Sequence, residues 1–398
     1  MVADHPLSVE TLAVKGTSPH YDEGSAVQPI YQTSTFLFQG EVGYENVRYT
    51  RCNNGPNHMA LSAHIAALEN TEAAMVASSG MAAISTALLA FLQAGDHLLM
   101  QNTCYGGTYD FVTKNLPAWK ISHSLIDASQ PNTWKAALKP STKIIYVESL
   151  CNPSSDVPDL QAVVSFAKAN SLMSFIDNTF ASPVLCRPAD LGFDIVLESA
   201  TKYMGGHSDL IAGSYAGSKR NVQKILQLHN HMGGSLDPNS IFLIQRGLKT
   251  LPLRVHQACS NALALAELLQ KQPQVDTVRY AGLRDHRDHR LVQKYFGGHA
   301  GGVFCFDLKG SLEDGQTFLH ALKIPLLAPS LGSVETLITQ PALTSHAGLT
   351  PDEMQAAGIK DGTIRVAVGI EHADDLIADF KQALSAIDKA KVHSNGIA

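Results

Sequence analysis

A lysine and two hydroxyl side chains occur together in the stretch Ser199-Ala200-Thr201-Lys202-Tyr203-Met204-Gly205-Gly206-His207-Ser208-Asp209. The stretch follows an apolar run over residues 194–197, which is typical of a buried strand. A lone lysine on a glycine-rich loop is usually a solvated surface cation. At a strand end in a partly apolar site, Lys202 can instead act as a nucleophile and form a Schiff base with an aldehyde.

A carboxylate ends a second apolar run, over residues 172–177. Asp177 can cap a helix, but burial at the end of such a run would require a cationic partner. A strand-end amine and a strand-end anion on one sheet are what pyridoxal phosphate (PLP) requires. The amine binds its aldehyde, and the anion faces its protonated ring nitrogen.

Strand and helix patterns alternate between residues 58 and 217. The predicted strands cover residues 73–77, 97–100, 121–125, 143–148, 172–177, 195–199 and 211–217. This alternation predicts an α/β fold with a mostly parallel seven-stranded sheet that is covered on both faces. Ligands of such sheets bind at the carboxyl ends of the strands, where the polar residues singled out here lie.

The chain is predicted to have three parts. Residues 1–58 are rich in Gly, Pro, Asn and Thr and indicate an extended N-terminal arm. Residues 59–248 form the large domain. Residues 249–398 form a smaller C-terminal α/β domain, with strands at 302–308, 336–339 and 363–369.

Further side chains are candidates for binding a phosphate and an aromatic ring. Gly80 and Met81 follow a strand and open a helix, and the backbone N–H groups of such a helix start bind phosphate. Ser199 and Thr201 add hydroxyl donors beside Lys202. Tyr105, at another strand-to-helix turn, can stack on a ring or can be an ordinary core tyrosine.

A cation interrupts the apolar run over residues 363–369. Arg365 can form a structural salt bridge, or its guanidinium can grip the α-carboxylate of an amino acid through two hydrogen bonds. Beside a cofactor site the second interpretation gains weight. Ser330 and Asn152 are further candidates for binding that carboxylate.

Composition narrows the classes of partner. The 398 residues are 45% hydrophobic and 17% charged, and the net charge of -6 shows no basic excess for nucleic acid or anionic membranes. No apolar run reaches the ~20 residues that span a bilayer, and no secretory signal is visible. Six scattered cysteines without metal-type spacing indicate reduced thiols and no metal site. We therefore expect a cytoplasmic enzyme.

Taken together, these motifs resemble the Cys/Met-metabolism (transsulfuration) family of PLP enzymes, the group of cystathionine γ-lyase, cystathionine γ-synthase and methionine γ-lyase. The resemblance covers residues 9–388. It is carried by the lysine stretch, Asp177-Asn178-Thr179-Phe180, Tyr105-Gly106-Gly107-Thr108, Ser330-Leu331-Gly332-Ser333-Val334-Glu335-Thr336, Arg246-Gly247-Leu248-Lys249-Thr250 and Thr363-Ile364-Arg365-Val366-Ala367-Val368-Gly369-Ile370-Glu371.

The resemblance implies the fold and the assembly. It implies the PLP-dependent transferase fold type I in a homotetramer of two active dimers. Tyr49 and Arg51 of the arm would bind the phosphate of a neighbouring subunit's cofactor, and Thr179 would join the cofactor site. Lys202 would move protons at the substrate, and Tyr105 would serve as the acid toward the γ leaving group.

The implied reaction is α,γ-elimination of cystathionine or a related γ-substituted amino acid. It gives a thiol or amino acid, a 2-oxo acid and ammonia. The alternative is γ-replacement by a cystathionine γ-synthase or O-acylhomoserine sulfhydrylase, and a third hypothesis is a binding protein without turnover.

Three departures from the family pattern affect the choice of substrate. Gly107 stands where methionine γ-lyases carry a cysteine, which disfavours that specialisation. Pro329 replaces a glutamate of several cystathionine enzymes. The loop that begins at Arg51 is one residue longer than usual.

Overall fold

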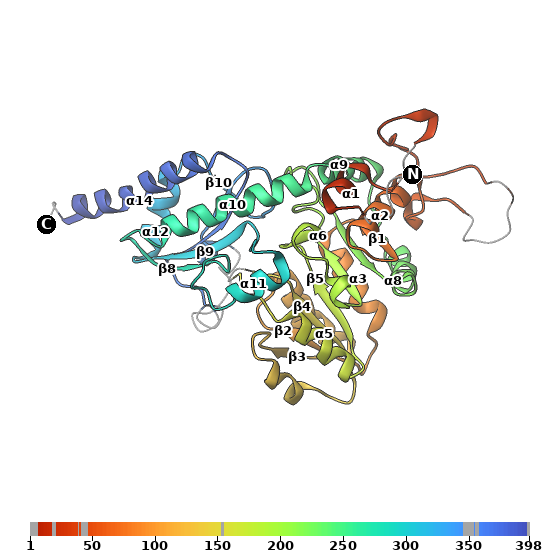
Figure 1. Cartoon of the computed structure of the whole chain (residues 1–398). Helices are drawn as coiled ribbons and strands as arrows, with labels where there is room; N and C mark the ends of the chain where they lie inside the picture. The colour runs from red at the N-terminus through yellow and green to blue at the C-terminus, as the bar shows by residue number, and fades with distance from the viewer. Residues whose placement is uncertain are drawn as a thin grey trace. The chain divides into compact units, whose positions relative to one another are not determined.

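The computed structural model describes residues 7–17, 21–38, 40, 47–152, 155–344, 354 and 358–395. The chain divides into two compact units, coloured along the chain in Figure 1. The first is Met1–Ser149 with Pro158–Pro252, and the second is Leu150–Val157 with Leu253–Ala398. The predicted limits after residues 58 and 248 stay predictions. The grouping of Leu150–Val157 with the C-terminal unit had no counterpart in the sequence pattern.

The first unit contains a seven-stranded sheet in the order β1-β7-β6-β5-β4-β2-β3. Its strands are β1 (Ala73–Ala77), β2 (His97–Gln101), β3 (Ser122–Ile126), β4 (Thr142–Glu148), β5 (Met173–Asp177), β6 (Ile195–Glu198) and β7 (Gly213–Gly217). Neighbouring strands from β3 to β6 pair in parallel, whereas β7 is antiparallel to both β6 and β1. The mostly parallel sheet predicted from the alternation is therefore confirmed.

Nine α-helices that lie wholly within this unit are described. They are α1 (Val9–Lys15), α2 (Pro56–Leu68), α3 (Gly80–Phe91), α4 (Gly106–Asp110), α5 (Leu160–Ala169), α6 (Ser182–Leu185), α7 (Pro188–Leu191), α8 (Lys219–Met232) and α9 (Pro238–Leu248). Side chains cap four of them, because Ser79, Asp159, Ser218 and Asp237 each accept a hydrogen bond from the backbone N–H three residues later. The segment Pro131–Ala137, between β3 and β4, forms a 3₁₀ helix.

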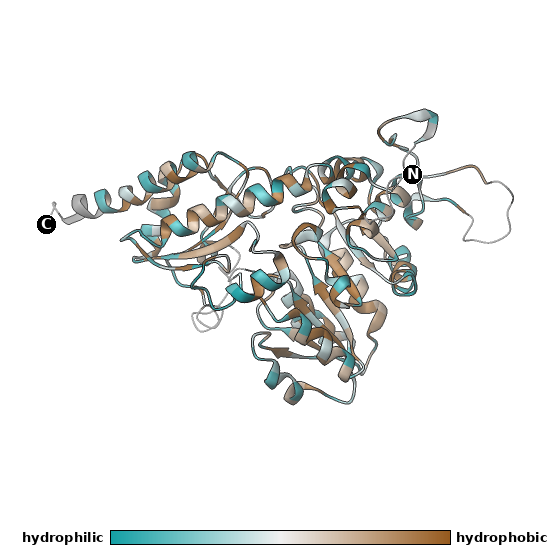
Figure 2. Ribbon diagram, viewed as in Figure 1, coloured by the Kyte–Doolittle hydropathy of each residue, from teal (hydrophilic) through white to brown (hydrophobic). Residues whose placement is uncertain are grey.

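The core of the first unit lies between the sheet and its helices. Leu98, Ile144, Phe175 and Leu197 are fully buried on the strands and pack with apolar residues of α3 and α8. Figure 2 shows the apolar colouring along these strands. Strands covered on both faces carry nearly continuous apolar runs, which is why the sequence pattern located them.

The carboxyl ends of three central strands are aligned. Glu148 of β4 lies opposite Asp177 of β5, and Asp177 lies opposite Leu197 of β6. The backbone continues the ladder for one more step, since the Asn178 N–H donates to the Leu197 carbonyl at 2.8 Å. The residues that follow these strands therefore emerge at one edge of the sheet.

The second unit contains a five-stranded sheet in the order β10-β11-β12-β9-β8. Its strands are β8 (Val275–Arg279), β9 (Val303–Leu308), β10 (Leu326–Leu327), β11 (Leu337–Thr339) and β12 (Thr363–Ala367), of which only β10 and β11 pair in parallel. Its helices are α11 (His289–Phe296), α12 (Leu312–Ala321) and α14 (Ala373–Asn395), and α10 (Leu251–Leu269) begins just before the unit. The predicted smaller α/β domain is confirmed.

Buried aromatic rings join the helices of the second unit to its sheet. Phe306 of β9 contacts Phe318 of α12 edge-on, and Phe318 contacts Phe380 of α14, each at 5.7 Å between ring centroids.

No helix within the described ranges combines the length and the apolar character needed to cross a membrane.

Candidate active site

The start of α3 lies directly against Ser199. The Ser79 side chain caps the helix by accepting from the Ala82 N–H at 3.0 Å. A Cβ atom placed on Gly80 would lie 2.9 Å from both Cβ and Oγ of Ser199, and one on Gly213 would overlap the Ser79 carbonyl. Glycines thus permit the close approach, and a helix N-terminus with an adjacent hydroxyl can bind the phosphate of PLP.

The backbone around Lys202 forms a tight turn after β6. The Lys202 N–H donates to the Ser199 carbonyl at 2.9 Å, and the Lys202 carbonyl accepts from the Gly206 N–H at 2.7 Å. Helix α9 closes the turn from outside, because a Cβ on Gly247 would overlap the carbonyls of Met204 and Gly205. The half-buried lysine is therefore presented from a fixed backbone.

Thr179 links Asp177 to the lysine turn. Its hydroxyl donates to Asp177 Oδ1 at 2.5 Å, and its backbone N–H donates to the same oxygen at 3.0 Å. The Thr179 hydroxyl oxygen also accepts the N–H of Ser199 at 2.8 Å. The carboxylate of Asp177 and the turn that contains Lys202 are thus connected through the side chain of Thr179.

The buried Asp177 carboxyl is suited to face a cation. Burial raises its pKa, while the hydrogen bonds from Thr179 and from Tyr146 lower it. The Tyr146 hydroxyl reaches Oδ2 only at 3.4 Å, so this oxygen is weakly bound compared with Oδ1. A protonated pyridine nitrogen would provide the missing positive charge, and the donor set at this edge of the sheet therefore fits PLP.

Tyr105 is held beside the start of α3. Its backbone N–H donates to Glu148 Oε1 at 2.6 Å, and its side chain is 48% exposed. A Cβ on Gly107 would lie 2.6 Å from Cε1 of the Tyr105 ring and 3.3 Å from Met81 Sδ. The ring therefore lies over Gly107, near Met81, and any side chain at position 107 would displace it.

Thr201 directs its hydroxyl to the backbone. Its Oγ1 donates to the Ala212 carbonyl at 3.0 Å and accepts from the Ala212 N–H at 2.9 Å. The hydroxyl proton is thereby engaged by the Ala212 carbonyl. A role of Thr201 in binding the cofactor stays a prediction.

Tyr49 and Arg51 lie against helix α8. The Arg51 guanidinium donates to the Asn230 carbonyl at 2.7 Å and lies 5.6 Å from the centroid of the Tyr49 ring. Both side chains are exposed on the first unit. Their predicted role toward a neighbouring subunit's cofactor stays a prediction.

The residues predicted to bind the substrate carboxylate all belong to the second unit. Arg365 is buried on β12, and its Nη2 donates to the Ser330 carbonyl. Ser330 has a φ of 95°, a left-handed backbone that is uncommon for serine. Asn152 lies in Leu150–Val157, the segment that groups with this unit.

Sequence reasoning missed two supports of the site, Tyr146 and Glu148. Both lie on β4, and Glu148 ends its apolar run just as Asp177 ends the next strand. The same strand-end pattern could have indicated Glu148. Tyr146 carries no such pattern, because a buried tyrosine in a strand is usually a core residue.

A buried pair of acids lies behind the lysine turn. Glu69 caps the C-terminus of α2 and Glu198 ends β6, and their exposed fractions are 0% and 3%. Burial raises the pKa of Glu69 to about 8, although contact with Glu198 and the charge of Arg187 lower it. Burial and then the charges of Glu69 and Asp177 raise the pKa of Glu198 well above its usual range. The two buried acids therefore hold their protons to higher pH than exposed glutamates do.

Replacing Glu69 with Gln is expected to flatten the dependence of stability on pH. The raised pKa of Glu69 makes its full contribution to the free energy of unfolding below the ordinary pKa of 4.5. This contribution is lost as the pH rises toward about 8. Urea unfolding between about pH 5 and about pH 8 measures this slope. The exposed Glu267→Gln serves as the control, and parallel curves for Glu69→Gln and the wild type would contradict the assignment.

Comparison with known proteins places these features in a family. The model of the Cys/Met metabolism PLP-dependent enzyme family matches residues 10–385. A cystathionine beta-lyase of Bacillus subtilis is 42% identical over 93% of this chain and 94% of its own length. An L-methionine gamma-lyase of Treponema denticola is 39% identical over 92% of this chain and 94% of its own length.

Two solved structures cover nearly the whole chain. A cystathionine gamma-lyase from Lactobacillus plantarum, complexed with L-serine, has a TM-score of 0.91 and 37% identity, covering 96% of this chain and 100% of that chain. A cystathionine gamma synthase from Xanthomonas oryzae pv. oryzae, in complex with aminoacrylate and cysteine, has a TM-score of 0.92 and 34% identity over 97% of this chain and 100% of that chain.

These similarities confirm the predicted fold type, the PLP cofactor and the class of enzyme, a PLP-dependent lyase of sulfur amino-acid metabolism. They extend over the arm, both units and the lysine turn. The chain belongs to the Cys/Met metabolism family of PLP-dependent enzymes.

Proposed function

We propose that this protein is a carbon–sulfur lyase that performs α,γ-elimination on cystathionine or a related γ-substituted amino acid. Cystathionine would give cysteine, a 2-oxo acid and ammonia. The observation that carries the proposal is the half-exposed Tyr105 phenol over Gly107, at the edge of the sheet that carries Asp177 and Lys202. A phenol in this place can protonate a departing sulfur.

PLP, when bound, withdraws electrons from the substrate Cα and so makes its proton removable. In this chain the Lys202 amine would hold the aldehyde carbon before the substrate enters. Once displaced, the same amine would take the proton from Cα and return it further along the substrate. Asp177, held by Thr179, would keep the ring nitrogen protonated.

Phosphate and carboxylate recognition would come from separate sets of residues. Backbone N–H groups of Gly80 and Met81, with the Ser199 hydroxyl, would hold the phosphate. A guanidinium suits the planar α-carboxylate of the substrate, and Arg365 is buried at the middle of its sheet with its orientation fixed by the Ser330 carbonyl. We assign Asn152 to the same carboxylate.

Gly107 supports cystathionine over methionine as the substrate. A cysteine there would collide with the Tyr105 ring, whose Cε1 atom would be 2.6 Å from the added Cβ. The space above Gly107 is therefore filled by the tyrosine that we assign as the acid. A pocket shaped for methionine through a side chain at this position would require a different place for that ring.

The six cysteines support a cytoplasmic location, because all six are free thiols. We also propose a homotetramer of two active dimers, in which Tyr49 and Arg51 of one subunit complete the phosphate site of the next. Both side chains are exposed, with Arg51 bound to the backbone of α8, and they are therefore accessible to a second chain.

A substrate panel tests the reaction. With L-cystathionine we expect 2-oxobutanoate, ammonia and cysteine, and with L-methionine a much slower release of 2-oxobutanoate. Lys202→Ala should lower turnover by about 10²–10⁴-fold, because it removes the proton-transferring base. Products are identified by separating the 2-oxo acids.

Other products would contradict the proposal in distinct ways. Pyruvate with homocysteine from cystathionine would mean β-elimination instead. Cystathionine formed from an acylated homoserine and cysteine, without any 2-oxo acid from thioether substrates, would mean the γ-replacement reaction.

Mixing two inactive variants tests the shared site. Arg51→Ala should weaken cofactor retention, and Lys202→Ala should lower turnover by about 10²–10⁴-fold. If each site combines Lys202 of one subunit with Arg51 of another, random mixed dimers regain about one quarter of the wild-type activity at limiting PLP. Activity that stays at the level of the separate variants would mean that each site is built within one chain.

A further inference from the structure

The segment between β4 and α5 is bound to the second unit, although both flanking elements belong to the first. The Ser155 hydroxyl donates to the carbonyl of Val303, on β9, at 2.7 Å. The Val157 N–H donates to Asp288 Oδ2 at 3.1 Å, and both of these hydrogen bonds are buried. The segment therefore has fixed attachments to two places in the second unit.

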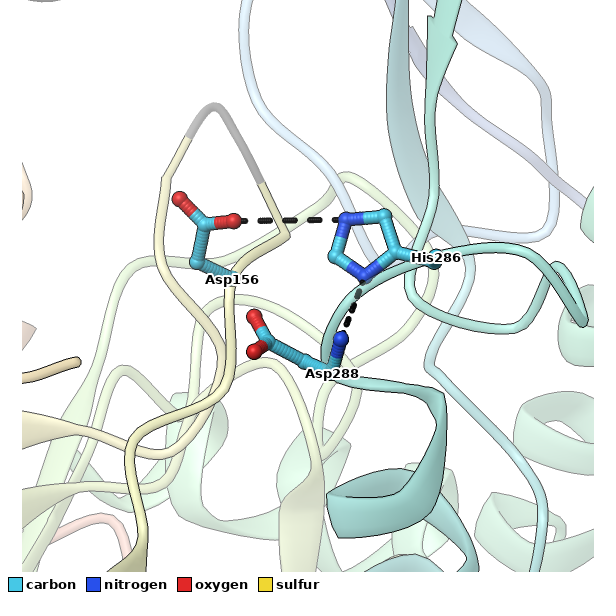
Figure 3. A group of neighbouring side chains, drawn as sticks. All are labelled: Asp156, His286 and Asp288. Carbon is cyan, nitrogen blue, oxygen red and sulfur yellow. Dashed lines mark hydrogen bonds and ion pairs between the residues drawn. The ribbon is translucent and has the colours of Figure 1, made fainter.

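Four charged or titratable side chains gather at one of these attachments. We call Asp156, His286, Arg287 and Asp288 the strap cluster, and Figure 3 shows three of its side chains. Arg287 Nη2 lies 2.9 Å from Asp156 Oδ1, and Arg287 Nε lies 3.6 Å from Asp288 Oδ2. His286 Nε2 lies 4.0 Å from the same Asp156 oxygen, and its Nδ1 accepts from the Asp288 N–H at 3.1 Å.

The strap cluster holds Asn152 through the backbone of its own segment. The Cys151 N–H donates to the Asp156 carbonyl at 3.0 Å, and the Cys151 carbonyl accepts from the Ser155 N–H at 2.8 Å. These two bonds close a short loop that includes Asn152. Fixing Asp156 and Val157 therefore fixes the backbone from which the Asn152 side chain extends.

The composition of the cluster favours an ion-pair anchor over a metal site. Ligand atoms of Asp156, His286 and Asp288 lie within 4.8 Å of one another, which is close enough to surround a cation. However, the Arg287 guanidinium already contacts both carboxylates, and Val157 and Asp288 N–H groups already use an aspartate oxygen and an imidazole nitrogen. A metal ion would have to displace these partners.

We propose that the strap cluster is a positioning device for substrate binding. It joins Asn152 to the unit that carries Arg365 and Ser330, so that all three groups assigned to the substrate α-carboxylate belong to one body. The proposal rests on that assignment in the proposed function. The strap residues themselves touch no substrate and act through Asn152.

Removal of the Asp288 carboxylate tests this role. In Asp288→Ala the Val157 N–H loses its acceptor and Arg287 loses one of its two carboxylate partners, so the loop around Asn152 should loosen. We expect the KM for cystathionine to rise on the order of tenfold, with kcat little changed and PLP affinity unchanged. Asp288→Asn keeps an oxygen acceptor for the Val157 N–H and should restore most of the wild-type KM.

A matched control breaks a different ion pair of the same unit. Asp276 forms a 2.8 Å pair with Lys360, and Asp276→Ala should leave KM unchanged.

A second variant, Arg287→Ala, removes part of the strap cluster without opening the core, because the Arg287 side chain is 62% exposed. It should raise KM in the same direction as Asp288→Ala and stays informative if the latter folds poorly.

Two readouts separate this proposal from the lyase proposal. L-Alanine has the α-carboxylate but no γ leaving group, so its binding can be measured from cofactor absorbance even in an enzyme without lyase activity. Its dissociation constant should rise in Asp288→Ala. Hydrogen exchange of the Cys151 and Val157 amides should accelerate, while exchange in β4 stays unchanged.

Some results would overturn the proposal. Unchanged alanine affinity and unchanged exchange in both Asp288→Ala and Arg287→Ala would do so. Stabilisation of the wild type by Zn²⁺ that His286→Ala abolishes would make the cluster a metal site. An Asp288→Asn variant as impaired as Asp288→Ala, with kcat reduced equally, would mean a purely structural role.

Discussion

The rest of the site depends on the hydroxyl group of Thr179. This one group donates to Asp177 and accepts from the backbone of Ser199, so it fixes the distance between the anion and the lysine turn. Because the carboxylate is buried, losing this hydrogen bond would leave Asp177 Oδ1 with the Thr179 backbone N–H as its remaining partner from Thr179. The parallel register of β5 with its neighbours brings both partners of Thr179 to the same edge of the sheet.

Close backbone approach is the second constraint on the site. Gly80 and Gly213 let the start of α3 lie against Ser199 and the beginning of β7, and Gly247 lets α9 lie against the lysine turn. A phosphate held by backbone N–H groups needs such an approach, because a side chain would fill the space. The buried acids Glu69 and Glu198 lie behind this arrangement, and burial followed by the charges of Glu69 and Asp177 raises the pKa of Glu198.

Much of the fold and of the candidate cofactor site follows from local sequence. Apolar runs that end in Asp177 or precede Ser199 are strands buried on both faces, and the parallel topology then places their ends together. The roles of Glu148 and Tyr146 depend on which strands are neighbours, which a single run does not reveal. The attachment of Asn152 to the second unit depends on contacts with Val303 and Asp288, more than a hundred residues away, and no local pattern encodes them.

The most direct test of the account is to identify the lysine that binds PLP. The protein is reconstituted with PLP and reduced with borohydride, and the modified peptide is located by mass spectrometry. The account predicts a single pyridoxyl group on Lys202, and a Thr179→Val variant that binds less PLP at the same residue. Modification of another lysine, or none in a protein that retains activity, would contradict it.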